Sequence, residues 1–412
     1  MTALPMTNPP MTNPLVARFL AELGDTGPLV LAVSGGGDSM AMLHLAVEAG
    51  LKPAVVTVDH GLRAEAAAEA LQVKTTARAH GLTHETLLWR DWDGTGNLQD
   101  AARRARRRLI GAWAQGRAVA LAHTADDVAE TFLMRLARGA GLDGLSAMAA
   151  RFTDEGTLWL RPLLWANRPD LRAYLQAQGR DWSEDPSNTN PRFDRVRARH
   201  ALTMLAPLGL TARRLAEVAS HLNDARAALE DVTNRASTCL TTNTLTVTIN
   251  PALFTHPSEI RRRLILRVIR FLAPADYGPR GPALTALLDR LHSKQPATLA
   301  GCRFIPDKTH ILAFREAKPV ATLRSPAHAL WDNRWRITPA PLNHEIAALG
   351  AHGLAQCPNW RTTGHPRAAL LSSPALWLND QLIAAPFAAP TAHYSIIPLS
   401  SVTTLHQSAI TD

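Results

Sequence analysis

The stretch Ser34-Gly35-Gly36-Gly37-Asp38-Ser39 directly follows the apolar run 29–33 and directly precedes residues 40–49, which are good helix formers. This order predicts a buried strand, a tight glycine-rich turn and a helix. Such a turn aims free backbone N–H groups and the positive end of a helix dipole at one point, and glycines let an anion come close to the backbone. The stretch therefore predicts a phosphate-binding loop, with an ordinary turn capped by Asp38 or Ser39 as the alternative.

The loop differs from the two commonest nucleotide-binding loops. A Walker loop ends in Gly-Lys-Ser/Thr, but no lysine precedes Lys52, and the G-x-G-x-x-G fingerprint of dinucleotide-binding proteins is absent as well. The loop instead resembles the pyrophosphatase loop of enzymes that split ATP into AMP and pyrophosphate. The ATP-binding residues predicted on this basis are Ser34, Gly35, Gly36, Gly37, Asp38 and Ser39.

Strand-like and helix-like patterns alternate from residue 28 to about residue 180. The expected strands are 29–33, 54–58, 85–88 and 118–122, and the expected helices lie near 40–49, 64–80, 97–115, 125–138 and 168–178. Alternation of this kind predicts an α/β fold with a doubly wound parallel sheet that binds ligands at the carboxyl ends of its strands. Polar groups stand at those ends, at 34–39, 59–60 and 123–127.

Composition shifts divide the 412 residues into four expected parts. These are a flexible leader over 1–25, a catalytic ATP-pyrophosphatase domain over 26–205, a helical domain over 206–317 and a small, partly β domain over 318–412. Within the second part, the glycine-rich residues 139–150 are expected to form a flexible connector.

Bulk properties narrow the possible functions. No apolar stretch approaches the roughly 18–20 residues of a membrane span, and the N-terminus lacks the basic and apolar regions of a signal peptide. The three cysteines are far apart, which argues against structural zinc, an iron–sulfur cluster or a disulfide framework and fits a reducing cytoplasm.

The positive charge of the chain is mostly arginine. The net charge is +9, and only five of the 44 basic residues are lysines. Arginine binds phosphate in a bidentate way, so clusters of arginine indicate RNA as a partner, with solvated helix faces as the alternative. Three clusters occur, at residues 103, 104 and 106–108, at residues 192, 195, 197 and 199, and at residues 261–263, 267 and 270.

The motif His123-x-x-Asp126-Asp127-x-x-Glu130 opens an expected helix. The helical period places His123, Asp127 and Glu130 on one face, where carboxylates can hold Mg²⁺ or receive a cationic substrate. The alternative is a capping box formed by Thr124 and Asp127.

Two further positions carry candidate chemistry. On the helix expected near 97–115, Arg103 is three and four residues from Arg106 and Arg107, and their repulsion is unfavourable unless an anion or carboxylate lies opposite. Asp59, at a strand end, is predicted to meet the nucleoside of ATP, or else to cap its own loop.

Six motifs occur in order between about residue 29 and residue 200: SGGGDS, VDHGLR, NLQDAARRAR, LAHTADDVAETFLMRLARGAGLDGL, RPLL and DWSEDPSNTNPRFDRVRAR. Together they resemble the bacterial tRNA(Ile)-lysidine synthetases. The region after residue 212 resembles that family's first C-terminal domain less distinctively, and the last 90 residues or so are placed only by position.

The resemblance implies a reaction in two steps on the wobble cytidine of a tRNA(Ile) with a CAU anticodon. ATP adenylates the C2 oxygen and releases pyrophosphate, and L-lysine then displaces AMP to give lysidine. Arg103, His123, Asp127 and Glu130 match catalytic positions, with the acidic pair implicated in lysine recognition. One departure is Arg107, where an aromatic residue is expected.

The remaining expectations concern the metal, tRNA and assembly. Asp38 and Asp126 are candidates for Mg²⁺, and a homodimer is expected. The predicted tRNA-binding residues are Arg195, Arg197, Arg199, Arg261, Arg262 and Arg263.

Two rival interpretations stay open. Other pyrophosphatase-loop enzymes are disfavoured, because a tRNA thiolase usually carries cysteine pairs and an amidotransferase synthetase carries a glutaminase domain, and this chain shows neither. A basic tRNA-binding protein that retains a relict nucleotide fold is the non-enzymatic alternative.

Overall fold

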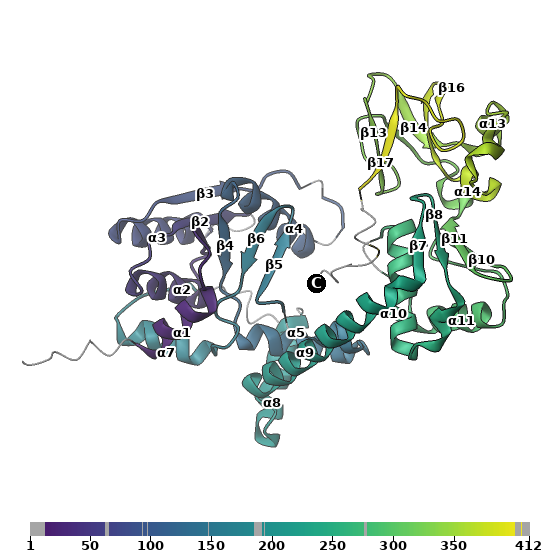
Figure 1. The fold of residues 1–412 in the computed structure, drawn as a ribbon. Coiled ribbons are helices and arrows are strands. Elements are labelled where there is room, and N and C mark those ends of the chain that lie inside the picture. Colours follow the sequence, from purple (N-terminus) through teal and green to yellow (C-terminus); the bar gives the residue numbers. More distant parts are fainter. Residues whose placement is uncertain are drawn as a thin grey trace, which may run out of the picture. The chain divides into compact units, whose positions relative to one another are not determined.

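A computed structural model of the chain describes residues 13–61, 66–92, 94–96, 98–146, 148–184, 192, 194–275, 278–399 and 405. The chain divides into two compact units, the first ending at Arg226 and the second beginning at Ala227 (Figure 1). Each unit has its own hydrophobic core.

The first unit is built on a six-stranded sheet with the strand order β3-β2-β1-β4-β6-β5. Five strands are parallel and β5 is an antiparallel edge strand. The predicted doubly wound parallel sheet is confirmed, and the β5–β6 hairpin is an addition to it. The strands are β1 (Leu29–Ala32), β2 (Ala54–Asp59), β3 (His84–Leu88), β4 (Ala118–Leu121), β5 (Arg151–Asp154) and β6 (Thr157–Leu160).

Helices cover both faces of this sheet because alternate strand residues are apolar on both sides. Leu31 and Val55 pack into the core formed with α1 (Pro14–Leu23), α2 (Gly37–Glu48), α3 (Ala66–Ala79) and α7 (Arg168–Ala177). Their neighbours Val30 and Val56 face the opposite core, formed with α4 (Leu98–Ala114). Each fully buried side chain of this kind contributes about 1.5–3 kcal/mol.

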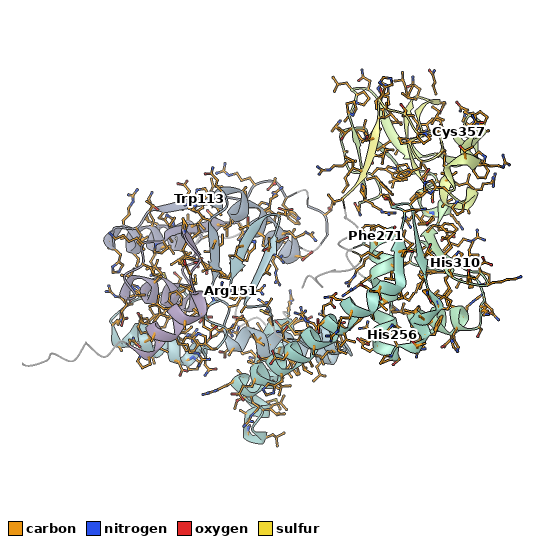
Figure 2. All side chains as sticks on the ribbon, in the orientation of Figure 1. Trp113, Arg151, His256, Phe271, His310 and Cys357 are labelled. Carbon is orange, nitrogen blue, oxygen red and sulfur yellow. The ribbon has the colours of Figure 1, made fainter. Side chains whose placement is uncertain are left out.

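Helix α1 corrects the expectation of a flexible leader over 1–25. The Asn13 side chain caps it by accepting from Leu15 N (3.0 Å), and Val16, Phe19 and Leu23 are buried on one face. Apolar residues at this helical spacing anchor the segment to the core. Arg151, which Figure 2 labels, donates to the carbonyl of Leu23 at the end of the helix. Residues 1–12 lie outside the described part of the chain.

The first unit is completed by helices that follow the sheet strands. The expected connector at 139–150 contains a short helix, α6, whose Leu145 packs with Val128 and Phe132 of α5. Helix α9 crosses the division between the two units, and its first half packs against α5 through Leu215 and Ala219. These elements are α5 (Ala125–Ala137), α6 (Leu142–Leu145), α8 (Asp194–Leu205), η2 (Ala206–Leu208) and α9 (Ala212–Ala236).

The second unit begins with a mixed α/β layer, so a purely helical description of 206–317 is incomplete. An antiparallel sheet in the order β7-β8-β11-β10-β9 packs with two helices, α10 (Ser258–Leu272) and α11 (Gly281–His292). Its strands are short, which explains why the helical period dominates the sequence pattern. The other elements are η3 (Ser237–Cys239), β7 (Leu240–Thr242), β8 (Thr246–Ile249), η4 (Pro251–Thr255), β9 (Ala297–Leu299), β10 (Cys302–Pro306) and β11 (Ile311–Arg315).

The end of the second unit contains β strands, short helices and a tryptophan-rich core that includes Trp331, Trp335 and Trp377. A four-stranded sheet has the order β12-β14-β15-β16, and β13 pairs with β17. The elements are α12 (Ala317–Val320), β12 (Arg324–Pro326), β13 (Trp335–Thr338), β14 (Glu345–Ala348), α13 (Gly350–Ala355), η5 (Trp360–Thr363), α14 (Arg367–Leu371), β15 (Pro374–Leu378), β16 (Gln381–Ala384) and β17 (Ser395–Pro398). The predicted domain boundaries at 205/206 and 317/318 stay predictions.

All three cysteines, Cys239, Cys302 and Cys357, are buried thiols without a disulfide; Figure 2 labels Cys357. Among the residues that the structure describes, none of the helices combines the length and the apolarity needed to cross a bilayer.

Candidate active site

The strand order places the predicted site. The order of the sheet reverses between β1 and its neighbour β4, so the loops after these two strands run to opposite faces. In open α/β sheets, ligands bind at this position, outside the carboxyl ends of the strands. The glycine-rich loop follows β1 and the His123 motif follows β4. The fold therefore brings together the two motifs that the sequence predicts to act together.

The glycine-rich loop is held in shape by its own serines. Ser39 Oγ donates to the carbonyl of Gly36 (2.9 Å) and accepts from the backbone N–H of Ser34 (3.1 Å). Gly35 has φ 91°, a conformation that favours glycine, and Gly36 is the N-cap of α2. Since Ser39 is buried and braces the loop, the exposed Ser34 is the better placed of the two serines to meet a phosphate.

Residues after α7 bracket the loop from outside. Ser183 donates its backbone N–H to the carbonyl of Gly35 (2.9 Å), and a Cβ on Gly37 would stand 3.3 Å from the Trp182 ring. A side chain at position 37 would therefore fit only if the Trp182 ring moved by a few tenths of an ångström. Residues 185–191 of this motif lie outside the described part of the chain.

Helix α5 begins later than the His123 motif suggests. Thr124 is its N-cap, so His123 precedes the helix, and the expectation that His123 shares a helical face with Asp127 and Glu130 is wrong in this detail. Asp127 Oδ2 accepts from Thr124 N (3.0 Å) and Thr124 Oγ1 (3.1 Å), which is the predicted capping box. The capping role uses only one oxygen of Asp127.

A side chain that the sequence did not single out, Arg168, gathers the acidic residues of the site. Its Nε donates to Asp38 Oδ2 (3.2 Å), its Nη2 to Asp127 Oδ1 (2.8 Å) and its Nη1 to Glu130 Oε1. The backbone N–H of Arg168 donates to Asp126 Oδ2 (2.8 Å). We call Asp38, Asp126, Asp127 and Glu130 the acidic wall.

Burial and Arg168 act in opposite directions on the acidic wall. Burial raises the pKa of Asp38 to about 6, although Arg168 lowers it. For Asp127, burial also raises the pKa, but Arg168 and His123 outweigh it and hold the value below its usual range. The pKa of Arg168 is raised because Asp127 and Glu130 outweigh its own burial. Arg168 is therefore a permanent cation in the site.

Two buried polar atoms at the site have no hydrogen-bond partner in the described part of the chain. One is Glu130 Oε2, on a side chain that is 1% exposed, and the other is His123 Nδ1. Glu130 Oε1 also accepts from Arg199 Nε (3.0 Å). Arg199, predicted to bind tRNA, thus contacts the acidic wall. An unpaired buried oxygen is costly, which marks Glu130 Oε2 as the place for a missing donor.

Arginines on α4 and α8 form a second, positive group, which we call the cationic group: Arg103, Arg106 and Arg195. Partial desolvation and the positive charge of neighbouring arginines lower the pKa of Arg103 and of Arg106, although both residues are exposed on α4. Among the described residues, neither Arg103 nor Arg195 forms a hydrogen bond or ion pair with a carboxylate. Unbalanced positive charge of this kind indicates a site for an anion.

The acidic wall and the cationic group both act on the pKa of His123. Burial and the positive charges of Arg161, Arg103 and Arg195 lower its pKa well below the usual range, against the opposing effect of Asp127. His123 is therefore a neutral imidazole at pH 7. It can donate or accept a hydrogen bond there, but it does not add to the positive charge.

Two other predicted positions have local partners. Asp59 Oδ1 accepts from Gly61 N (2.9 Å), which is the capping alternative for this residue, and its ATP contact stays a prediction. Arg107, the departure from the family pattern, pairs with Asp154 (2.9 Å) and lies over the Phe152 ring. It therefore stabilises the β5 edge, and its positive charge also lowers the pKa of the neighbouring Arg103, whose own desolvation acts in the same direction.

The arginines predicted on α10 differ from the cationic group. Arg263 is 2% exposed and pairs with Glu259 (2.9 Å) and Glu230 (3.4 Å), so burial removes it as a tRNA contact. Arg262 pairs with Glu259 (2.7 Å) and is partly exposed. Arg261 is also partly exposed, and Arg197 pairs with Asp194 on the surface of α8.

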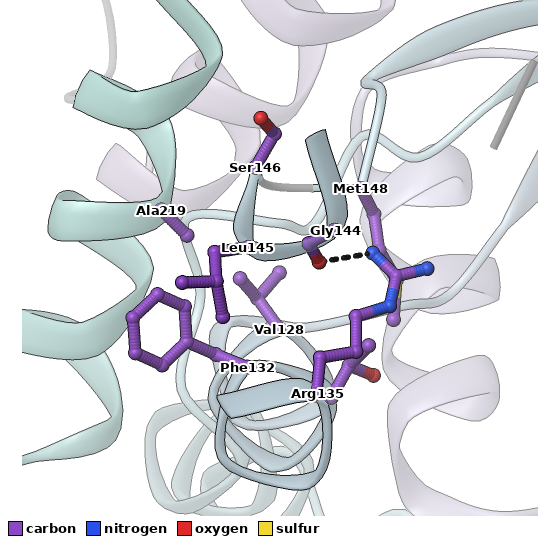
Figure 3. A pocket seen from close by; sticks show the side chains of 9 residues that line it. Val128, Phe132, Arg135, Gly144, Leu145, Ser146, Met148 and Ala219 are labelled. Atoms are coloured by element: carbon purple, nitrogen blue, oxygen red, sulfur yellow. Dashed lines mark hydrogen bonds between the residues drawn. The ribbon is translucent and has the colours of Figure 1, made fainter. Parts of the chain in front are cut away.

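A shallow hollow lies beside α5, between α5, α6 and α9 (Figure 3). Arg135 donates to the carbonyl of Gly144 there (2.9 Å), and the lining is mainly apolar, with Val128, Phe132 and Leu145. It contains none of the acidic wall. We interpret the hollow as a gap between packed helices and not as a ligand site.

The donor set fits Mg²⁺ in part. The described residues contain no group of three or more metal-binding side chains. However, Mg²⁺ at nucleotide sites usually takes one or two carboxylates, with phosphates and water as its other ligands. Asp38 and Asp126 each have one oxygen bound by Arg168, and within the described part of the chain the second oxygen of each accepts no hydrogen bond.

Comparisons with known proteins identify the family of the chain. Residues 12–206 match the model of the PP-loop domain family. The chain is 47% identical to the tRNA(Ile)-lysidine synthase of Ruegeria pomeroyi over 388 residues, covering 92% of each chain. It is 39% identical to the tRNA(Ile)-lysidine synthase of Bradyrhizobium diazoefficiens, covering 81% of this chain and 96% of the relative.

Among solved structures, the chain is similar to the U34-tRNA thiolase NcsA from Methanococcus maripaludis. The sequence identity is 15% and the TM-score 0.44, and the match covers 50% of this chain and 77% of the thiolase. The identity to the Ruegeria pomeroyi relative extends over nearly the full length of both chains. The chain therefore belongs to the tRNA(Ile)-lysidine synthase family.

Proposed function

We propose that this protein joins L-lysine to C2 of the wobble cytidine in a tRNA(Ile) with a CAU anticodon, cleaving ATP to AMP and pyrophosphate. The observation that carries the proposal is the pairing of an acidic wall with a cationic group at the strand ends where the ATP loop lies. The reaction needs both: positive charge for phosphates and the adenylated oxygen, and negative charge for the lysine ammonium.

Adenylation uses the loop and the cationic group. The N–H groups at the start of α2 and the helix dipole bind phosphate oxygens. Arg103 and Arg106 balance negative charge that develops as the C2 oxygen of cytidine attacks the α-phosphate and pyrophosphate leaves. Asp38 and Asp126 would hold Mg²⁺, which supplies further charge neutralisation on the phosphates when bound.

Lysine attack uses the acidic wall. Glu130 Oε2 is buried and lacks a donor, so the lysine ammonium supplies the hydrogen bonds that this atom lacks. The lysine amine that attacks C2 first gives a proton to water. As its nitrogen bonds to C2, the C2–O bond breaks and AMP leaves with that oxygen.

For tRNA, Arg195 in the first unit and the partly exposed Arg261 and Arg262 in the second are the proposed phosphate contacts, with Arg197 as a weaker one because of its ion pair. Lysine and tRNA as substrates, and a homodimer as the assembly, are parts of this proposal.

Labelled lysine tests the function directly. We expect ATP-dependent transfer of the label to tRNA(Ile) bearing a CAU anticodon, with AMP and pyrophosphate as the other products. ADP as the product would contradict the loop assignment, and tRNA binding without transfer would favour the relict-fold alternative.

Glu130→Gln tests the lysine site. The loss of one desolvated charge should weaken lysine binding by about 2–5 kcal/mol and raise the KM for lysine, while tRNA adenylation without lysine continues. If Glu130 served the metal instead, adenylation would fail first and excess Mg²⁺ would partly restore it. Glu22→Gln, an exposed residue on α1, is the matched control.

A further inference from the structure

The position of Arg168 is unusual for an arginine. Asn167 is the N-cap of α7, so Arg168 is the first residue of the helix and Pro169 the second. A cation at a helix N-terminus is disfavoured by the helix dipole. The contacts of Arg168 with the acidic wall offset this cost, and its backbone N–H is fixed by Asp126. The hydrogen bond to Asp126 therefore fixes the backbone from which the Arg168 side chain extends.

The Arg168 guanidinium connects the part of the site proposed to bind ATP with the part proposed to bind lysine. Asp38 belongs to the ATP loop at the start of α2, whereas Asp127 and Glu130 belong to α5. Each of the three nitrogens of Arg168 donates to a different one of these carboxylates. A planar, forked cation is suited to such an arrangement, and a lysine ammonium cannot reproduce it.

Arg168 uses one oxygen of each carboxylate. The second oxygen of Asp127 is taken by Thr124, so Asp127 has both oxygens bound. The second oxygen of Glu130 is buried without a partner in the described residues. Within the described residues, Arg168 thus holds Asp38 and Glu130 so that each keeps one oxygen for a ligand. Asp127 has no oxygen left and only links Arg168 to Thr124.

We propose that Arg168 is the positioning residue that couples the two half-reactions, by holding the ATP-loop carboxylate Asp38 and the lysine-binding carboxylate Glu130 on one guanidinium. This inference rests on the proposed function. It assigns Glu130 the direct contact with the lysine ammonium and gives Asp127 the role of orienting Arg168.

The test compares Arg168→Ala, Arg168→Lys and the control Arg18→Ala, an exposed arginine on α1. We expect Arg168→Ala to slow tRNA adenylation without lysine by about 10- to 100-fold and to raise the KM for lysine by a similar factor. Arg168→Lys should restore charge but not geometry, and so recover thermal stability more than either kinetic parameter. Arg18→Ala should match the wild type.

Guanidinium ion added to Arg168→Ala supplies a second readout, because a small planar cation fits the space left by the side chain. We expect it to restore adenylation of the Ala variant and to leave the control unchanged. Circular dichroism and thermal unfolding establish that each variant is folded.

Three outcomes would overturn the proposal. The first is a lower KM for lysine in Arg168→Ala, which would make Arg168 a competitor of the substrate. The second is a loss of stability with both half-reactions intact, and the third is a defect in only one of them. A wild-type protein that transfers no lysine would instead refute the proposed function itself.

Discussion

On α4, Arg103 and Arg106 lie near enough to Arg195 for mutual repulsion to lower their pKa values, whereas on α10, Arg263 and Arg267 are buried against Glu230. In the sequence, both groups are runs of arginine on a helix. In the structure, one group lacks carboxylate partners among the described residues and the other is neutralised by them.

The difference shows that the counter-ion, and not the cluster, distinguishes a binding site from a structural ion pair. An arginine without a carboxylate partner keeps its positive field for a ligand. A buried and paired arginine has already lost its hydration and its field, and it serves the fold. Four predictions test this comparison, beginning with the largest effect.

Arg103→Ala should abolish most of the catalysis without reducing stability. We expect the adenylation rate to fall about 100- to 1000-fold, equivalent to about 2.7–4 kcal/mol, because a preorganised positive charge at the reacting centre is lost. The free energy of unfolding should stay constant or rise slightly, since repulsion with Arg106 and Arg195 is relieved. Single-turnover adenylation and urea unfolding measure the two quantities. A stability loss with normal adenylation would mean that Arg103 serves the fold, as Arg263 does, and not the reaction.

Arg263→Ala should give the reverse pattern. Removal of this buried arginine leaves Glu230 with Arg267 alone and Glu259 with Arg262 alone. Each carboxylate then lacks one of its two cationic partners, so the free energy of unfolding should fall by about 3 kcal/mol. Adenylation per folded molecule should stay near the wild-type value. Urea unfolding of the variant beside Arg235→Ala, an exposed arginine of α9 with an ion pair, supplies the control. Equal stability of the two variants would contradict the assignment.

Asp38→Asn should raise the free energy of unfolding in a pH-dependent way and abolish adenylation. The folded-state pKa of Asp38, about 6, lies above its unfolded value of 3.8, so the folded state releases its proton at higher pH than the unfolded state does. The free energy of unfolding therefore falls as the pH rises from about 4 to about 6, because Asp38 becomes ionised in the folded state. We expect Asp38→Asn to gain about 1–2 kcal/mol relative to the wild type between pH 4 and pH 7, while adenylation is lost. A stability difference that does not change with pH would disprove the shift.

Arg195→Gln should have a small effect on tRNA affinity. If it contacts one phosphate, the slope of log K against log salt should become less steep by about 1, and Arg263→Gln should leave the slope unchanged. With about five neutralised phosphates the wild-type slope should be roughly −3.5 to −4.5. Filter binding over a salt series measures it. A wild-type slope near zero would mean that the arginines are ordinary surface residues.

The sequence predicted the parts of the fold that depend on local patterns. The loop at 34–39, the parallel strands and helices α3, α4, α5 and α7 follow from apolar runs, glycines and helical periods. Helix α1 was missed because its Val16, Phe19 and Leu23 stand in a segment that follows a Pro- and Thr-rich start. The sheet of β7 to β11 was missed because strands of three to five residues carry little period.

The site was predicted where residues act within a motif and missed where they act across the fold. Arg168 is 130 residues from Asp38 in the sequence, and no spacing rule joins them. One signal was available, since a basic residue at the start of a helix, directly after the Asn167 cap, opposes the helix dipole and requires carboxylates nearby. For Arg263, the spacing to Glu259 one turn earlier on α10 indicates an ion pair, but the second partner, Glu230, lies on α9 and no spacing joins the two.

The order of the two half-reactions tests the central claim most directly. Wild-type protein is mixed with ATP labelled in the α-phosphate, Mg²⁺ and tRNA(Ile) with a CAU anticodon, first without lysine and then with it. We expect labelled adenylated tRNA to accumulate with release of pyrophosphate, and lysine then to discharge the label as AMP while lysidine forms. Formation of ADP, or no labelled tRNA before lysine is added, would contradict it.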